Sequence, residues 1–217
     1  MFEFCVFTFV LMLDMILARK LVIHMKSIEQ LVDPSGVILT RDAEESGISK
    51  YALYAFLEKN SFEKVGQGIY VSPTAWADEL YILSLRCPKG VISHDEALYH
   101  YGLIDREPLQ RTITVYTGYS TSRLTRGGIK VFTVKKELLG LGKIVVSTSF
   151  GHNIPMYDMD RTICDLIRNR SWFEIQDYQM ALQSYIRNKN KDLNKLMGYA
   201  KAFHVDAKVR EYMEVML

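Results

Sequence analysis

Two short helical segments joined by a glycine turn constrain most strongly how this chain folds. The first, residues 40–47, begins at Thr40, a residue typical of helix N-caps, and ends at Gly47. Ser49 then caps a second helix, KYALYAFLEKN, whose apolar residues recur at the spacing of one helix face. Because glycine permits a sharp turn between two short helices, the segment predicts a helix-turn-helix motif.

A predicted β-hairpin follows the two helices. Residues 62–72 have the pattern of strand, turn and strand, and Gly66 and Gly68 suit a tight turn that needs positive φ. Upstream, SIEQLV has helical spacing and residues 37–39 are β-like. Three helices and a hairpin within residues 25–73 have the order of a winged helix-turn-helix domain.

A winged domain that binds DNA places the N-terminal residues of its second motif helix in the major groove. Here those residues carry hydroxyl, ammonium and phenol groups, which reach phosphates or base edges. The start of the preceding helix and the wing add groups that can follow the DNA backbone. The predicted DNA-binding residues are Arg41, Ser49, Lys50, Tyr51, Tyr54, Lys64 and Gln67.

The charge of the predicted winged domain argues against a strong DNA footprint. Residues 25–73 carry five Lys and Arg against seven Asp and Glu, a net charge of −2, whereas DNA-binding domains are usually basic. Glu44 and Glu45 would have to face away from the phosphates. A winged-helix module that docks a partner protein therefore remains the alternative function.

The remaining residues, 74–217, form a second domain in this interpretation. Helical patterns come first, then β-like runs at 111–117, 129–134 and 143–150, then further helices, so the fold class is α+β. Ser93 and Glu96 have the spacing of a helix capping box.

A group of basic residues lies in and after the loop between the first two of those runs. Such a group favours anionic partners, although ordinary solvated surface is the simpler interpretation. The possible accessory basic patch consists of Arg123, Arg126, Lys130, Lys135 and Lys136.

The sequence carries no catalytic signature, and we expect no enzyme activity, metal or cofactor. Neither HExxH, a Walker lysine loop nor GxSxG occurs, and the six-residue spacing of His94 and His100 puts them on different faces of a helix. Asp158, Asp160 and Asp165 suggest structural roles, with Asp160 where a helix cap belongs. Three widely spaced cysteines form no disulfide framework, which favours the cytoplasm.

The first 24 residues differ from the rest of the chain. They are largely apolar but are interrupted by Asp14 and followed by Arg19 and Lys20, which suits neither a secretory signal nor a full membrane span. Three interpretations stay open: a mis-assigned start with Met25 as the native first residue, an extra element packed on the body, or a weak membrane anchor.

Several segments in order resemble the AbiEi family, the antitoxins of type IV (abortive infection) toxin–antitoxin systems. They are TRDAEESGISKYALYAFLEKNSFEKVGQGIYVSP, CPKGVISHDEALYHYGL, RTITVYT and DRTICDLIRNR. The resemblance covers about residues 26–205 and consists of many matches in the right order rather than one signature.

The resemblance implies a function in phage defence. It implies a winged domain that binds promoter inverted repeats and represses its own operon, with residues Ser49, Lys50, Tyr51 and Tyr54 as DNA contacts by position. It also implies a C-terminal domain required for antitoxicity. The functional partner would be a nucleotidyltransferase-like toxin that is countered without a stable complex.

Overall fold

The computed structural model describes residues 28–216, with side chains as far as Glu214. The chain divides into two compact units between Arg86 and Cys87. The sequence analysis assigned residues 74–86 to the second domain, whereas the structure keeps them with the first. The reason is that Ile82 of helix α4 (Glu79–Arg86) packs in one apolar cluster with strand residues of the first unit. The predicted apolar extension 1–24 lies outside the described residues.

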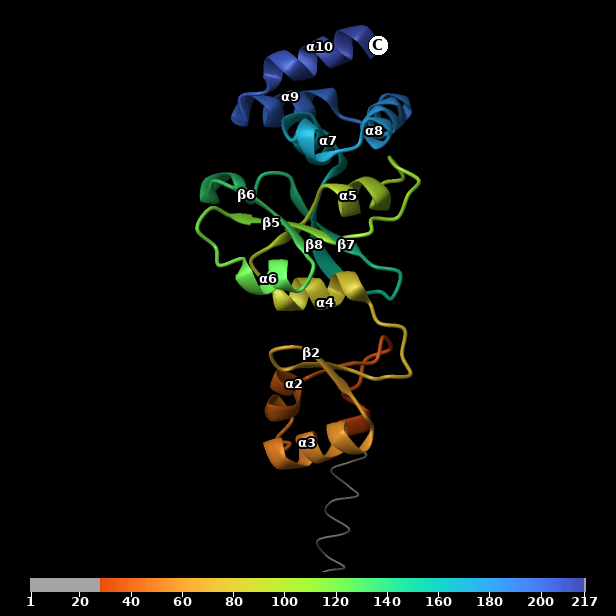
Figure 1. The fold of residues 1–217 in the computed structure, drawn as a ribbon, viewed down its shortest axis with the longest axis vertical. Coiled ribbons are helices and arrows are strands. Elements are labelled where there is room, and N and C mark those ends of the chain that lie inside the picture. The colour runs from red at the N-terminus through yellow and green to blue at the C-terminus, as the bar shows by residue number, and fades with distance from the viewer. Residues whose placement is uncertain (1–27, 217) are drawn as a thin grey trace, which may run out of the picture. The chain divides into compact units, whose positions relative to one another are not determined.

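The first unit is a winged helix-turn-helix (Figure 1). Its antiparallel sheet has the order β1-β3-β2, formed by β1 (Val37–Leu39), β3 (Ile69–Val71) and β2 (Glu63–Gly66). Helices α2 (Thr40–Glu45) and α3 (Lys50–Lys59) lie between β1 and β2 in the chain. The N-terminal winged fold predicted from the sequence is therefore confirmed.

The core of this unit joins the motif helices to the sheet. Leu53 and Phe56 of α3 are buried with Ile38 of β1, Ala43 of α2 and Tyr70 of β3. These α3 residues are the ones that the helical spacing placed on one face. The burial fixes which face of α3 turns inward and leaves the opposite face to solvent.

The wing is a two-residue hairpin turn, and one of its two glycines has the predicted conformation. Gly68 has φ of +69°, which is costly for a residue with a Cβ. Gly66 lies in β2 with ordinary backbone, beside a register shift between Lys64 and Gly66. The predicted cap of α2 also differs: α2 begins at Thr40 itself and its start has no side-chain cap.

The second unit is a mixed sheet covered by helices. Its strands are β4 (Val91–Ile92), β5 (Thr112–Tyr116), β6 (Lys130–Val134), β7 (Lys143–Ser147) and β8 (Asn153–Tyr157), in the order β6-β5-β4-β8-β7. The pairs β5–β6 and β4–β8 are parallel, and the other two pairs are antiparallel. The α+β class is confirmed.

The helices of the second unit gather mainly on one side of the sheet, with α6 on the other side (Figure 1). They are α5 (Asp95–His100), α6 (Ser122–Arg126), α7 (Met159–Arg168), α8 (Ile175–Arg187), α9 (Leu193–Ala202) and α10 (Asp206–Met216). The helices α7 to α10 share the largest apolar core. Every residue of α7 from Met159 to Ile167 is buried.

An ion pair lies at the centre of this helical core. Arg161 and Asp165, both fully buried, are joined at 3.0 Å, and the Arg161 guanidinium stacks between the rings of Tyr157 and Phe203 at 4.0 and 4.2 Å. Arg161 also donates to the carbonyl oxygen of Leu138. Because a buried charge is costly without partners, these contacts give Arg161 and Asp165 a structural role.

The N-cap of α7 also differs from its prediction. Asp158, not Asp160, caps α7 and accepts a hydrogen bond from the Arg161 N–H at 2.8 Å. Asp160 instead accepts bonds from the Tyr185 hydroxyl and the Asp192 N–H. Both carboxylates thus hold helices together, as the sequence analysis expected in general terms.

The predicted capping box of Ser93 and Glu96 is wrong. His94 occupies the N-cap position of α5 without a side-chain cap, and the Glu96 N–H donates to the hydroxyl of Thr112 on β5 at 3.1 Å. The Ser93 hydroxyl bonds to Thr114 at 2.8 Å instead. Hydroxyl groups of the neighbouring strand β5 therefore bond the Glu96 N–H and the Ser93 hydroxyl, in place of the bonds that the capping box predicts.

Candidate nucleic-acid interface

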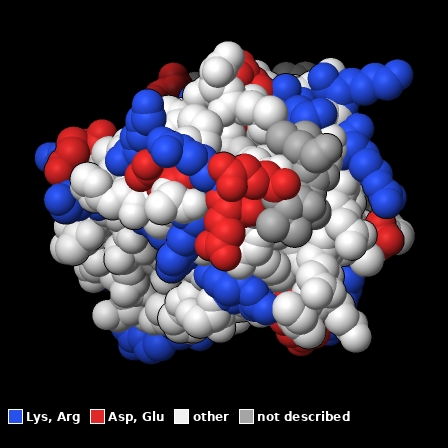
Figure 2. All heavy atoms as spheres, turned by 90° about the horizontal axis from the view of Figure 1, so that it is seen from above, with Lys and Arg blue, Asp and Glu red and all other residues white. Residues whose placement is uncertain are grey.

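Charges of both signs share the exposed surface. Figure 2 shows Lys and Arg side chains interspersed with Asp and Glu on the face it displays. The whole chain has a net charge of only +2. Long-range attraction to a polyanion is therefore modest, and any DNA site depends on local geometry.

The N-terminus of α3 is capped by a serine side chain that directly precedes the helix. Ser49 has extended backbone, and its hydroxyl accepts a hydrogen bond from the Ala52 N–H at 3.2 Å. The predicted cap is confirmed. The cap fixes the first turn of α3, where free backbone N–H groups favour anions.

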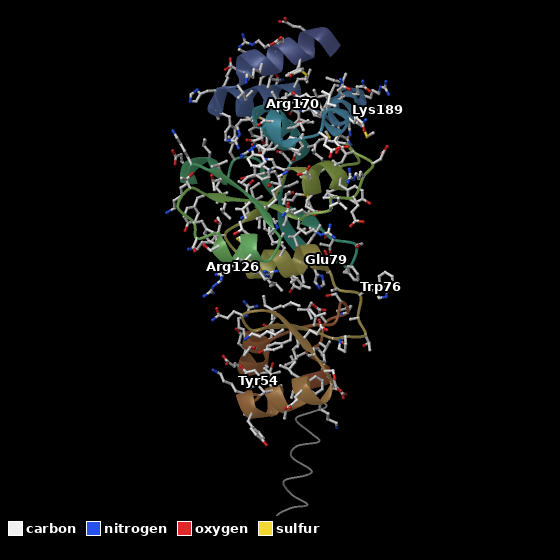
Figure 3. All side chains as sticks on the ribbon, viewed as in Figure 1. Tyr54, Trp76, Glu79, Arg126, Arg170 and Lys189 are labelled. Carbon is white, nitrogen blue, oxygen red and sulfur yellow. The ribbon has the colours of Figure 1, made fainter. Side chains whose placement is uncertain are left out.

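The solvent face of α3 carries two tyrosines. Tyr51 is 80% exposed and Tyr54 is 48% exposed. The Tyr54 ring meets Tyr70 of β3 edge to face at 6.4 Å, and the side chain points outward from α3 (Figure 3). Exposed aromatic rings with a hydroxyl can both stack and form hydrogen bonds, so this face can contact nucleic acid or protein.

The cations beside this face are already paired with carboxylates. Lys50 forms an ion pair of 3.1 Å with Glu44. Arg41 lies 3.2 Å from Asp42 and 3.8 Å from Glu45. The sequence analysis required Glu44 and Glu45 to face away from bound phosphates, whereas the structure places both beside the predicted phosphate contacts.

These pairs are weak because all their side chains are exposed. Exposed ion pairs contribute roughly 0 to 1 kcal/mol and are screened by salt. A phosphate can therefore replace the carboxylate at small cost, but the net charge of the face stays low until it does. Lys64 and Gln67 of the wing are exposed in the same unit.

The predicted accessory patch is divided in the structure. Arg123 and Arg126 lie exposed on α6, and Lys135 and Lys136 are exposed after β6, with Lys136 at 5.9 Å from the Tyr116 ring. Lys130 differs, because its side chain is only 24% exposed and lies 3.6 Å from Asp95.

Lys130 belongs to a groove of about 310 Å³ in the second unit. Its ammonium group lies within 6 Å of three ring centroids, those of Phe132, Trp172 and Phe173. Trp172 and Asp95 were not singled out as groove residues in the sequence, because the fold brings them to Lys130 from different segments. Asp95 comes from the start of α5, and Trp172 comes from the segment before α8. Burial raises the pKa of Asp95, and Lys130 opposes that rise.

His94, which the sequence analysis considered beside His100, is buried in the second unit. Its ring stacks on Phe132 at 3.5 Å and bonds Ser93 through Nδ1 and Asn169 through Nε2, both at 2.9 Å. Burial, followed by the charges of Arg168, Arg161 and Lys130, holds the pKa of His94 well below its usual value. A neutral, enclosed imidazole serves the fold rather than proton transfer to a substrate.

No group of His, Cys, Asp and Glu side chains within residues 28–216 could hold a metal ion. In the same described part of the chain, no helix is long and apolar enough to cross a membrane.

A comparison with protein families supports the assignment of the first unit as a winged domain. The model of the family described as transcriptional regulator, AbiEi antitoxin, matches residues 27–73, which confirms the predicted resemblance in that segment. No curated protein sequence matches the chain. These residues therefore match a family of antitoxin-type regulators.

A solved structure extends the likeness in fold. The crystal structure of the RV2827C protein from Mycobacterium tuberculosis matches with a TM-score of 0.58 and 13% sequence identity, covering 81% of this chain and 70% of that chain. At this identity the likeness concerns the fold alone.

Proposed function

We propose that this protein is a DNA-binding antitoxin that represses its own operon through the winged unit. The observation that carries the proposal is the Ser49-capped start of α3, with Lys50, Tyr51 and Tyr54 exposed beside it. The match of residues 27–73 to AbiEi antitoxin regulators supports the same conclusion.

In this proposal α3 lies in the major groove. Its first backbone N–H groups and Lys50 bind phosphates, while Tyr51 and Tyr54 reach base edges. Arg41 holds a further phosphate at the start of α2. Lys64 and Gln67 on the wing follow the adjacent backbone or the minor groove. The DNA would carry the inverted repeats of its own promoter.

Binding would exchange partners at the cations. Lys50 leaves Glu44, and Arg41 leaves Asp42 and Glu45, to meet phosphates. Because the carboxylates remain nearby, the net positive charge that faces the DNA is smaller than the total charge of Lys50 and Arg41. Since the salt dependence of binding follows the phosphates neutralised, we expect it to be shallow for a protein of this kind.

The second unit would supply antitoxin action. The partner we propose is a nucleotidyltransferase-like toxin of a type IV abortive-infection system, countered in the cytoplasm without a stable complex. The exposed cations Arg123, Arg126, Lys135 and Lys136 are the proposed accessory contacts, while Lys130 is already engaged by Asp95. Charge reversal at Arg123 and Arg126 should weaken operator affinity or toxin rescue.

A gel-shift titration at two salt concentrations tests the repressor half. The protein is titrated against the DNA upstream of its own gene and against unrelated DNA of the same length. We expect preference for the upstream DNA and binding that weakens as salt rises. Lys50→Ala should weaken binding by about 1 kcal/mol, roughly fivefold, through loss of one charged phosphate contact.

Lys59→Ala is the matched control, because Lys59 lies at the opposite end of the same helix. Equal loss in both variants would contradict the placement of α3. No preference for the upstream DNA would favour the alternative, a winged module that docks a protein through Tyr51 and Tyr54.

A further inference from the structure

Strand β7 forms an edge of the second unit's sheet. It pairs with β8 on one side, and it is the last strand of the order β6-β5-β4-β8-β7. Among residues 28–216 no strand pairs with its other side. An edge strand presents a row of unpaired N–H and C=O groups that can pair with another chain.

β7 exposes apolar side chains on both of its faces. Ile144 stands opposite Met156 of the core and is still 39% exposed, while Val145 stands opposite Pro155 on the other face and is 67% exposed. Edge strands are usually protected by charges, proline or bulges. β7 has one charge, Lys143 at its first residue, and its register with β8 is regular.

We propose that β7 pairs antiparallel with β7 of a second copy of this chain, about a two-fold axis at Val145. Val145 then faces the partner's Val145, and Ile144 faces the partner's Val146. Both residues of each of these cross-strand pairs are β-branched, a residue type that favours β-strands. The sheet and its core face continue from one copy into the other.

The register is determined by the sequence of the strand itself. A shift by one residue would turn the core faces of the two sheets to opposite sides. A shift by two residues would set Lys143 or Ser147 against Val145. Centring on Val145 alone keeps the three central pairs apolar.

Charge also permits a second copy. In this register each Lys143 faces the partner's Ser147. The two Lys143 positions are four residues apart along the strands, about 14 Å, which exceeds the screening length of about 8 Å at physiological salt. The two copies of the strand therefore meet without close repulsion.

The contact is isologous, so it closes at two copies. One five-residue strand from each copy is a small interface, and small interfaces give weak, concentration-dependent association. The proposed dimer is independent of the proposed function, because it is argued from the edge strand β7 and tested by the molecular mass in solution.

Sedimentation equilibrium of the full chain tests the contact over about 10 to 500 µM, the range in which weak interfaces associate. We expect the average mass to rise from 25.1 kDa toward twice that value. Val145→Lys should keep the mass near 25.1 kDa at every concentration. Since Val145 is largely exposed, the melting temperature of the Val145→Lys variant should match that of the unmodified protein.

Thr133→Lys is the matched control, because Thr133 is exposed on β6 at the opposite edge of the sheet. This variant should associate like the unmodified protein. A constant mass in the unmodified protein would overturn the proposal. So would undiminished association of Val145→Lys, loss of association in Thr133→Lys, or growth beyond two copies.

Discussion

Two serines that look alike in the sequence end in different roles in the two units. Ser49 caps α3, and its hydroxyl accepts a hydrogen bond from the Ala52 N–H of the same helix. Ser93 was expected to cap α5, but its hydroxyl bonds to Thr114, and Thr112 receives the Glu96 N–H in its place. A cap follows from local sequence where the helix start is exposed, and is replaced where a strand brings competing hydroxyls to it.

The largest expected effect comes from placing the same residue at both serines. Ser49→Asp should change the free energy of unfolding by less than about 0.5 kcal/mol, because Asp and Ser cap equally well. Ser93→Asp should destabilise the protein by about 3 kcal/mol or more, because it puts a carboxylate at a fully buried position. Urea unfolding of both variants measures the difference. Similar losses at the two sites would remove the distinction between them.

A smaller effect concerns His94, which occupies the N-cap position of α5 that was predicted for Ser93. Its pKa is lowered in the folded protein from 6.5, so the unfolded chain binds the extra proton. The stability from neutral His94 is complete above pH 6.5 and decreases as pH falls below it. The unfolding free energy should fall between about pH 7.5 and about pH 5.5 by about 1.4 kcal/mol more in the unmodified protein than in His94→Asn.

Asn is chosen because His94 has φ of +53° and ψ of −123°, the angles of the first central position of a type II′ turn, where Gly, Asn and Asp predominate. His204→Asn is the control, since His204 has φ of +57° but is exposed. The other groups near His94, namely Arg161, Arg168 and Lys130, are present in both proteins. An unchanged pH dependence in His94→Asn would show that His94 ionises freely in the fold.

The smallest effect concerns the ion pair beside the Ser49 cap. If Lys50 exchanges Glu44 for a phosphate, Glu44→Gln should steepen the dependence of log Kd on log salt by up to about 0.9. Glu58→Gln removes the same charge from α3 itself, eight residues beyond Lys50 and about 12 Å from it along the helix axis, and should leave the slope unchanged. Gel shifts at four salt concentrations give the slopes of the unmodified protein and of the two variants. Equal slopes in all three proteins would mean that Glu44 does not offset the charge of Lys50.

Several elements of the fold followed from pattern alone. The apolar spacing of α3, the β-like runs of β5, β6 and β7 and the helices α7 to α10 were all expected from the sequence. Strand β8 was not, because Pro155 lacks the N–H of a paired strand and suggests a loop. Strand β4 has only two residues, too few to show a period.

The candidate site was predictable in part: its residues at the start of α3 could be chosen from the sequence, but the contacts of their side chains could not. The residues at the start of α3 could be chosen because the cap and the turn before it are local. The ion pair of Lys50 with Glu44 was not foreseen, because it depends on how α2 and α3 cross. The pair of Arg41 with Glu45 was also missed, although its i,i+4 spacing within α2 is readable from the sequence. Lys130 was expected on the strand after the loop, and it lies there, but the sequence did not show that β6 carries it into a groove beside Asp95 and Trp172.

The winged unit, the cap of α3 and the α+β order follow from local sequence, because helix period, turn glycines and caps act over a few residues. The tertiary structure alone decided that Thr112 replaces Ser93 at the start of α5. It also decided that the i,i+4 pair of Arg161 and Asp165 is enclosed in the core beside Phe203, and that β7 is left at an edge. The spacing of that pair is local, but its burial and the other two outcomes depend on residues far apart in the chain, where buried polar groups must find whichever partner the packing brings near.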